Sequence, residues 1–158
     1  MSSSTRRRCT AALVSALLMW FGVAAVARRG ASAQSDDAVV VLVNARNPTN
    51  ALAIAEAKKV FLGQTSFWHG VVPIKLVTRP DASPAAKAFY GLLGMTPQAY
   101  QKQWNELQLA GRGVLPKPVA SIQDVANAVA QMPGGIGFAL ASEAWNTQLK
   151  GVKIIPVR

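Results

Sequence analysis

The chain has 158 residues, 51% of them hydrophobic, and a formal net charge of +10. This composition excludes a disordered tail and suits one α/β domain of ordinary size. Five of the 17 basic residues and none of the seven acidic residues precede Gln34, so the later residues carry only +5. Because their lysines are scattered, the basic isoelectric point does not indicate a nucleic-acid partner. The single cysteine, Cys9, excludes a disulfide framework.

The first 33 residues have the pattern of a secretory signal peptide. Arginines at positions 6–8 precede an apolar run over residues 10–26, which is short for a spanning helix of about 20 residues. An A-x-A signal then ends at Ala33. We therefore expect cleavage after Ala33 and a periplasmic or secreted domain over residues 34–158. Arg28 and Arg29 interrupt the expected pattern, which leaves an uncleaved N-terminal membrane anchor as the alternative.

Strand and helix patterns alternate after the leader. The β-branched run at residues 38–43 predicts a strand that is covered on both faces. The turn that follows offers Thr49 or Asn50 as the cap of a helix over residues 51–61. A loop carrying Trp68 and His69 then leads into a second strand over residues 71–78.

The second half of the chain continues this alternation. Helix patterns cover residues 84–93, a segment that opens with Thr96-Pro97, and a segment that opens with the capping-box pair Ser121 and Asp124. Two further strands are predicted over residues 136–140 and 152–157. Together these patterns predict one α/β domain.

Residues 79–83 (Arg-Pro-Asp-Ala-Ser) are the clearest pointer to a ligand. They join the second strand to the second helix, and helix N-termini attract anions through free N–H groups and a partial positive charge. Arg79 adds a planar fork of donors and Ser83 adds a hydroxyl. Two plainer interpretations stay open: Ser83 is only a helix cap followed by Pro84, and Arg79 forms only a surface ion pair with Asp81.

The sequence offers little for catalysis or metal binding. His69 is the only histidine, so it has no histidine partner for a metal site. With one histidine, no cysteine after the leader and dispersed carboxylates, no triad or carboxylate pair can be assembled. We therefore predict no catalytic residue, no metal, no cofactor and no enzymatic activity.

Four short segments, in order, resemble a known family. They are Phe61-Leu62-Gly63, Trp68, the Arg-x-Asp-x-Ser turn at residues 79–83, and Pro-Gly-Gly-Ile-Gly-Phe at residues 133–138. The order and spacing resemble the phosphate-binding proteins of bacterial ABC phosphate transporters. The resemblance implies a three-layer, single-lobe α/β domain of the periplasmic-binding-protein type II fold, with four to five strands and flanking helices. It also implies that Arg79 and Ser83 contact a phosphate-like anion and that Asp81 orients Arg79.

The departures from that family shape the expected function. The family has two lobes that close over the anion, whereas residues 34–158 hold one. Where the family has Gly-Thr after the serine, this chain has Pro84 and Ala85, which removes donors for the anion. We expect an exported domain that binds a small oxyanion such as inorganic phosphate weakly, in or near phosphate transport. The alternative is a non-enzymatic interaction module with a degenerate site, which contacts an envelope protein or a second copy of itself.

Overall fold

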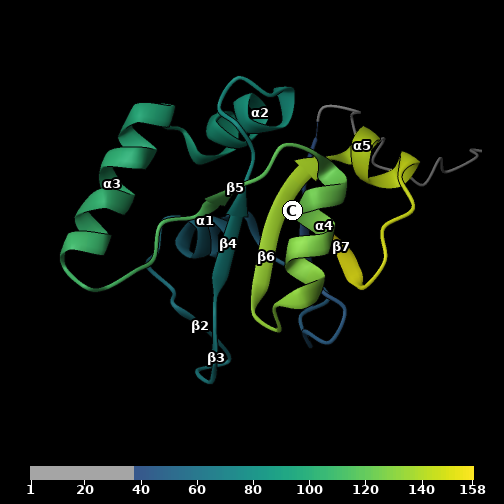
Figure 1. The fold of residues 1–158 in the computed structure, drawn as a ribbon, viewed down its shortest axis with the longest axis horizontal. Helices are drawn as coiled ribbons and strands as arrows, with labels where there is room; N and C mark the ends of the chain where they lie inside the picture. Colours follow the sequence, from purple (N-terminus) through teal and green to yellow (C-terminus); the bar gives the residue numbers. More distant parts are fainter. Residues whose placement is uncertain (1–37) are drawn as a thin grey trace, which may run out of the picture. The chain divides into compact units, whose positions relative to one another are not determined.

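The computed structural model describes residues 38–158, so the predicted leader and its cleavage site lie outside the described residues. A five-stranded sheet in the order β5-β4-β6-β1-β7 forms the centre (Figure 1). Its strands are β1 (Val39–Asn44), β4 (Lys75–Thr78), β5 (Lys117–Pro118), β6 (Gly135–Leu140) and β7 (Val152–Pro156). A separate antiparallel hairpin consists of β2 (Phe67–Trp68) and β3 (Val72–Pro73).

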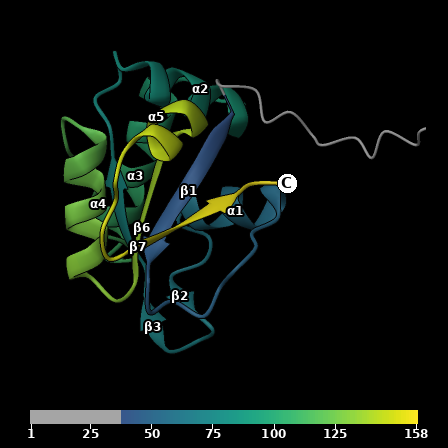
Figure 2. The ribbon, with the colours of Figure 1, turned by 90° about the vertical axis from the view of Figure 1, so that its right-hand side faces the viewer.

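Helices cover both faces of the sheet, as the predicted three-layer α/β fold requires (Figure 2). Along β1, Val41 and Val43 face the layer that contains α1 and α2, whereas Val40 and Leu42 face the layer with α4 and α5. All four side chains are fully buried, as predicted for a strand covered on both faces. The helices are α1 (Ile54–Phe61), α2 (Pro84–Leu93), α3 (Pro97–Leu109), α4 (Ile122–Gln131) and α5 (Ala141–Asn146).

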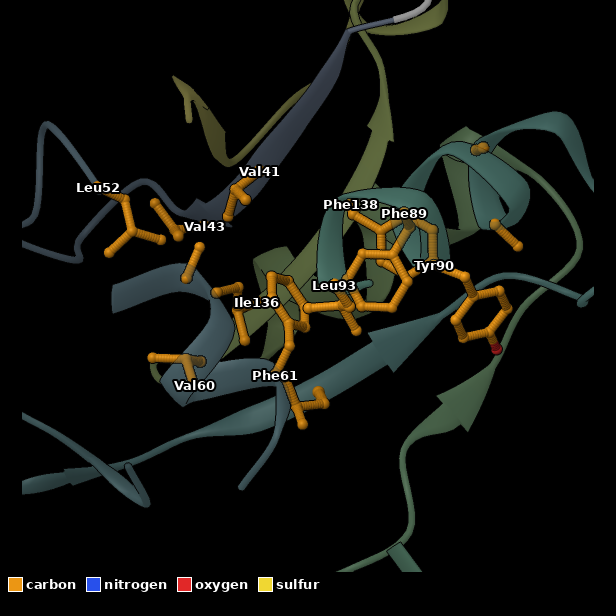
Figure 3. Packing of buried hydrophobic residues seen from close by; sticks show 14 of the residues in the cluster. Val41, Val43, Leu52, Val60, Phe61, Phe89, Tyr90, Leu93, Ile136 and Phe138 are labelled. Atoms are coloured by element: carbon orange, nitrogen blue, oxygen red, sulfur yellow. The ribbon is translucent and has the colours of Figure 1, made fainter. Parts of the chain in front are cut away.

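Aromatic packing fixes α1 and α2 on the sheet (Figure 3). The ring of Phe89 in α2 stacks on Phe138 of β6 with 3.9 Å between centroids, and Phe61 of α1 meets Phe89 edge-on at 4.8 Å. Trp104 of α3 donates its indole N–H to the carbonyl of Phe61 at 3.1 Å. Such aromatic contacts stabilise a core beyond the area that they bury. They hold α2, which directly follows residues 79–83, against the sheet.

The chain leaves the adjacent strands β4 and β6 in opposite directions across the sheet. β4 runs parallel to β5 and β6, whereas β1 runs antiparallel to β6 and β7. From β4 the chain continues through α2 and α3 to β5 on one side, and from β6 it continues through α5 to β7 on the other. Ligands of open α/β sheets bind outside the carboxyl ends of strands at such a switch point. Residue 79 follows β4 at that position.

The structure corrects several predicted boundaries. The first helix begins at Ile54 rather than at residue 51, because Leu52 forms a β-bridge with Val157 and the Ile54 N–H bonds to the Arg158 carbonyl. Its cap is therefore Ala53, and the prediction of Thr49 or Asn50 was wrong. The predicted second strand is split at Ile74, whose N–H bonds to the Ser66 carbonyl.

β5 and α5 were not predicted from the sequence, and they are only two and six residues long. Within residues 38–158, none of the helices is both long enough and apolar enough to cross a membrane.

Candidate functional site

A cleft of about 340 Å³ lies at the carboxyl end of β4. Its lining includes Thr78 and Arg79 at the end of β4, Tyr90 of α2, Tyr100 of α3 and Pro118 of β5. The cleft thus lies at the carboxyl end of β4 on the side of β5, beside the switch point between β4 and β6.

Arg79 is the most constrained polar residue of this cleft. Its side chain is only 8% exposed, and its Nη1 donates to Glu143 Oε2 of α5 at 3.2 Å. Its Nε is buried and has no hydrogen-bond partner anywhere in residues 38–158. A buried charge with an unsatisfied donor is costly unless a further partner reaches it. Arg79 therefore retains capacity for another acceptor.

Asp81 does not serve the role that the resemblance implied. We expected it to orient Arg79, but Glu143 is the acid that pairs with the guanidinium. The Asp81 carboxylate instead accepts from the Tyr90 hydroxyl at 2.6 Å and from Gln101 Nε2 at 3.0 Å. Burial raises the pKa of Tyr90, and the hydrogen bond to Asp81 adds to the increase. Tyr90 is therefore a neutral donor that fixes Asp81 between α2 and α3.

Ser83 is a helix cap, as one of the two interpretations predicted. Its Oγ accepts from the Ala86 N–H at 3.1 Å, and its carbonyl accepts from the Lys87 N–H. Pro84 occupies the first helical position and has no N–H. Helix geometry therefore leaves only the Ala85 N–H of the first turn without an intrahelical partner. The Ser83 hydroxyl still has its own proton to donate.

The predicted site residues are only partly brought together. Arg79 and Asp81 line the same cleft, whereas Ser83 is absent from its lining. Sequence reasoning missed Glu143, because it lies 64 residues from Arg79 and no local pattern links them. The charge of Arg79 also contributes to the lowered pKa of Asp124, after hydrogen bonds from Ser121. An anion that binds Arg79 would therefore share the guanidinium with the carboxylates of Glu143 and Asp124.

The residues around His69 have structural roles. Trp68 is buried and donates its indole N–H to the Gly134 carbonyl at 3.3 Å. His69 lies on the surface, 3.4 Å from Thr49 Oγ1. Across the described part of the chain, no three His, Cys, Asp or Glu side chains gather as a metal site would require.

The comparison with solved structures finds similar proteins, whereas the comparisons of sequence do not. No family model matches the chain, and no curated protein matches it in sequence. The fold matches an ABC-type phosphate transport receptor from Vibrio cholerae with a TM-score of 0.55 and 21% identity, over 75% of this chain and 45% of the receptor.

Two further solved structures are similar. One is a protein assigned as a phosphate ABC transporter substrate-binding protein from Clostridium perfringens, solved with bound phosphate. Its TM-score is 0.56 at 16% identity, over 77% of this chain and 44% of that one. The other is PstS from Borrelia burgdorferi, with a TM-score of 0.51 at 17% identity, over 77% of this chain and 47% of that one.

The chain thus spans less than half the length of these solved proteins. Its fold is that of a single α/β lobe of the periplasmic-binding-protein type. More specifically, the lobe resembles one half of the phosphate ABC transporter substrate-binding proteins, as its sequence segments predicted.

Proposed function

We propose that residues 34–158 form an exported, non-enzymatic domain of solute-binding-protein type that holds a small oxyanion such as phosphate weakly, in or near phosphate transport. The observation that carries the proposal is Arg79, a buried cation with an unpartnered Nε that lines a cleft at the carboxyl end of β4. The solved structures with the same fold support it, because they are phosphate-binding receptors.

The groups near the start of α2 suit one small oxyanion. Arg79 supplies the charge, and Ser83 supplies its hydroxyl proton. Asp81 positions the wall of the cleft through Tyr90 and Gln101. In this role Arg79 and Ser83 contact the anion, while Asp81 acts through its neighbours.

We expect the affinity to be low for two physical reasons. Glu143 already occupies one edge of the guanidinium, so the anion must share Arg79 with a carboxylate. The cleft is also open to solvent, so few contacts offset the entropy lost on binding.

Titration calorimetry with inorganic phosphate, and sulfate as a second oxyanion, tests the proposal at low salt. Removing Arg79 alone would leave Glu143 half-buried and unpaired, so the matched test replaces both residues, Arg79→Met with Glu143→Leu. Lys150→Ala, on an exposed loop before β7, is the control for loss of one positive charge. Phosphate heat in the wild type and the control, and none in the double variant, supports the site.

A degenerate interaction module is the second candidate function. It is favoured by Glu143, which neutralises Arg79 within the molecule, and by Pro84, which removes a donor from the start of α2. In that case, millimolar phosphate gives no heat with the wild type. Its partner would then be an envelope protein or a second copy of the chain.

A further inference from the structure

A second cavity, of about 510 Å³, adjoins the anion cleft and shares Trp104 and Leu115 with it. We call it the basic groove. The β2–β3 hairpin, the first residues of β4 and the segment between α3 and β5 line it, and Figure 1 shows these elements around β4. Its volume lies within the range of small-molecule sites, about 300–1,000 Å³.

Most of the surface that lines the basic groove is apolar. Val60, Leu76 and Trp104 form a buried floor, and Trp104 offers only its ring because its N–H bonds to a backbone carbonyl. At the rim, Phe67 is 50% exposed and Val114 is 83% exposed. Apolar surface in a concave site gains free energy when a ligand removes it from water.

Positive charges from separate elements surround these walls. Lys75 comes from β4, Arg112 from the segment after α3, and Lys117 from β5. No aspartate or glutamate is among the residues that line the groove. Within residues 38–158 the single ion pair is Arg79–Glu143, so these cations have no acidic partner there. The groove therefore combines an apolar body with uncompensated positive charge.

We propose that the basic groove binds a free anionic amphiphile, such as a medium-chain fatty acid. The hydrocarbon tail lies on Trp104 and Phe67, and the carboxylate lies beside Lys75, Arg112 or Lys117. Inorganic phosphate would leave the apolar walls exposed to water, and a neutral hydrocarbon would leave the cations unpaired. A protein partner is disfavoured because a stable protein interface needs about 800 Å² per partner, which is several times the surface that lines this groove.

Calorimetry of the full chain with monomeric decanoate tests the proposal, with octanoate and 1-decanol as chemical controls. Burial of a methylene contributes about 0.8 kcal/mol, so affinity rises about fourfold for each methylene from octanoate to decanoate. Decanol, which has the same tail and no charge, binds more weakly. The triple variant Lys75→Gln, Arg112→Gln and Lys117→Gln lowers decanoate affinity about tenfold, because each exposed cation contributes modestly.

Two matched variants separate this site from the anion cleft. Lys150→Gln, away from the groove, leaves decanoate affinity unchanged. Arg79→Met with Glu143→Leu also leaves decanoate affinity unchanged, so failure of the phosphate proposal would not affect this one. Val114→Ser, at an exposed rim position, weakens decanoate binding without disturbing the fold.

Three results would overturn the proposal. The first is equal affinity for octanoate, decanoate and decanol. The second is a triple variant that binds decanoate as tightly as the wild type. The third is Val114-dependent binding to phosphatidylglycerol vesicles without binding of monomeric decanoate, which would make this face a membrane-surface contact.

Discussion

The guanidinium of Arg79 has two possible partners, a carboxylate of its own chain and an external anion. Glu143→Gln keeps a hydrogen-bond acceptor near Nη1 and removes the competing charge. We expect this variant to bind phosphate about fivefold more tightly, since one partly buried charge contact contributes about 1 kcal/mol. Titration calorimetry measures the change, and Glu106→Gln on the exposed face of α3 is the control. Equal affinities of wild type and Glu143→Gln would contradict competition by Glu143.

The hydroxyl of Tyr100 affects stability rather than anion binding, because it is buried and has no hydrogen-bond partner in the described structure. An unsatisfied buried polar group is destabilising, so Tyr100→Phe should raise the free energy of unfolding by about 1 kcal/mol. Urea denaturation measures this change. Tyr90→Phe is the matched comparison, and it should be destabilising because it removes the hydrogen bond to Asp81. A less stable Tyr100→Phe variant would show that the hydroxyl has a partner in solution.

The same two tyrosines predict a loss of stability at alkaline pH. Burial raises the pKa of Tyr90 and Tyr100 above the ordinary value of about 10. The folded state thus binds their protons more tightly than the unfolded state does. Their contribution to stability is complete below about pH 10 and is lost as the pH rises above it. In urea melts at stepped pH values, the double variant Tyr90→Phe and Tyr100→Phe should lose less stability above pH 10 than the wild type.

At the scale of elements, the start of α2 decides how many donors an anion can meet. Pro84→Ala restores one N–H at an exposed position and keeps the Ser83 cap. We expect phosphate affinity to rise about fivefold, as one hydrogen bond to an anion contributes about 1 kcal/mol. Loss of the proline should lower the free energy of unfolding by about 0.5 kcal/mol. Calorimetry and urea melts measure both effects, and unchanged phosphate binding would place the anion away from this helix.

The elements whose ends carry a local signal could be predicted from sequence. α2 begins and ends as predicted, because Ser83-Pro84 opens it and Gly94 closes it in a left-handed conformation. α4 begins with the predicted capping box of Ser121 and Asp124. In contrast, the start of α1 depends on a bridge between Leu52 and Val157, which are distant in sequence. No local pattern contains such a contact.

In the candidate site, too, local sequence patterns predict some residues, whereas only tertiary packing brings in the others. Arg79 could be found from sequence because it follows a strand and precedes a capped helix. Its pairing with Glu143, and the binding of Asp81 by Gln101, arise from tertiary packing of α5 and α3. The basic groove also escaped sequence reasoning, since Lys75, Arg112 and Lys117 look like scattered surface charges until the fold brings them to one cavity.

At the scale of the whole molecule, residues 38–158 form one lobe, and no second lobe lies among these described residues. The solved proteins of similar fold are more than twice the length that this chain matches. Within residues 38–158 no second lobe covers the cleft at Arg79, so a cover would have to come from outside these residues. Whether such a cover is present consequently decides whether the proposed affinity for phosphate stays low.

Small-angle X-ray scattering with and without saturating phosphate distinguishes these cases. A lobe that binds phosphate alone keeps its radius of gyration, because residues 38–158 form one lobe and contain no hinge between two lobes. A second copy recruited to complete the site increases the radius of gyration and doubles the scattering mass, and this increase should vanish in Arg79→Met with Glu143→Leu. A decrease in the radius on adding phosphate would contradict the single open lobe, because it would require a closing motion within this chain.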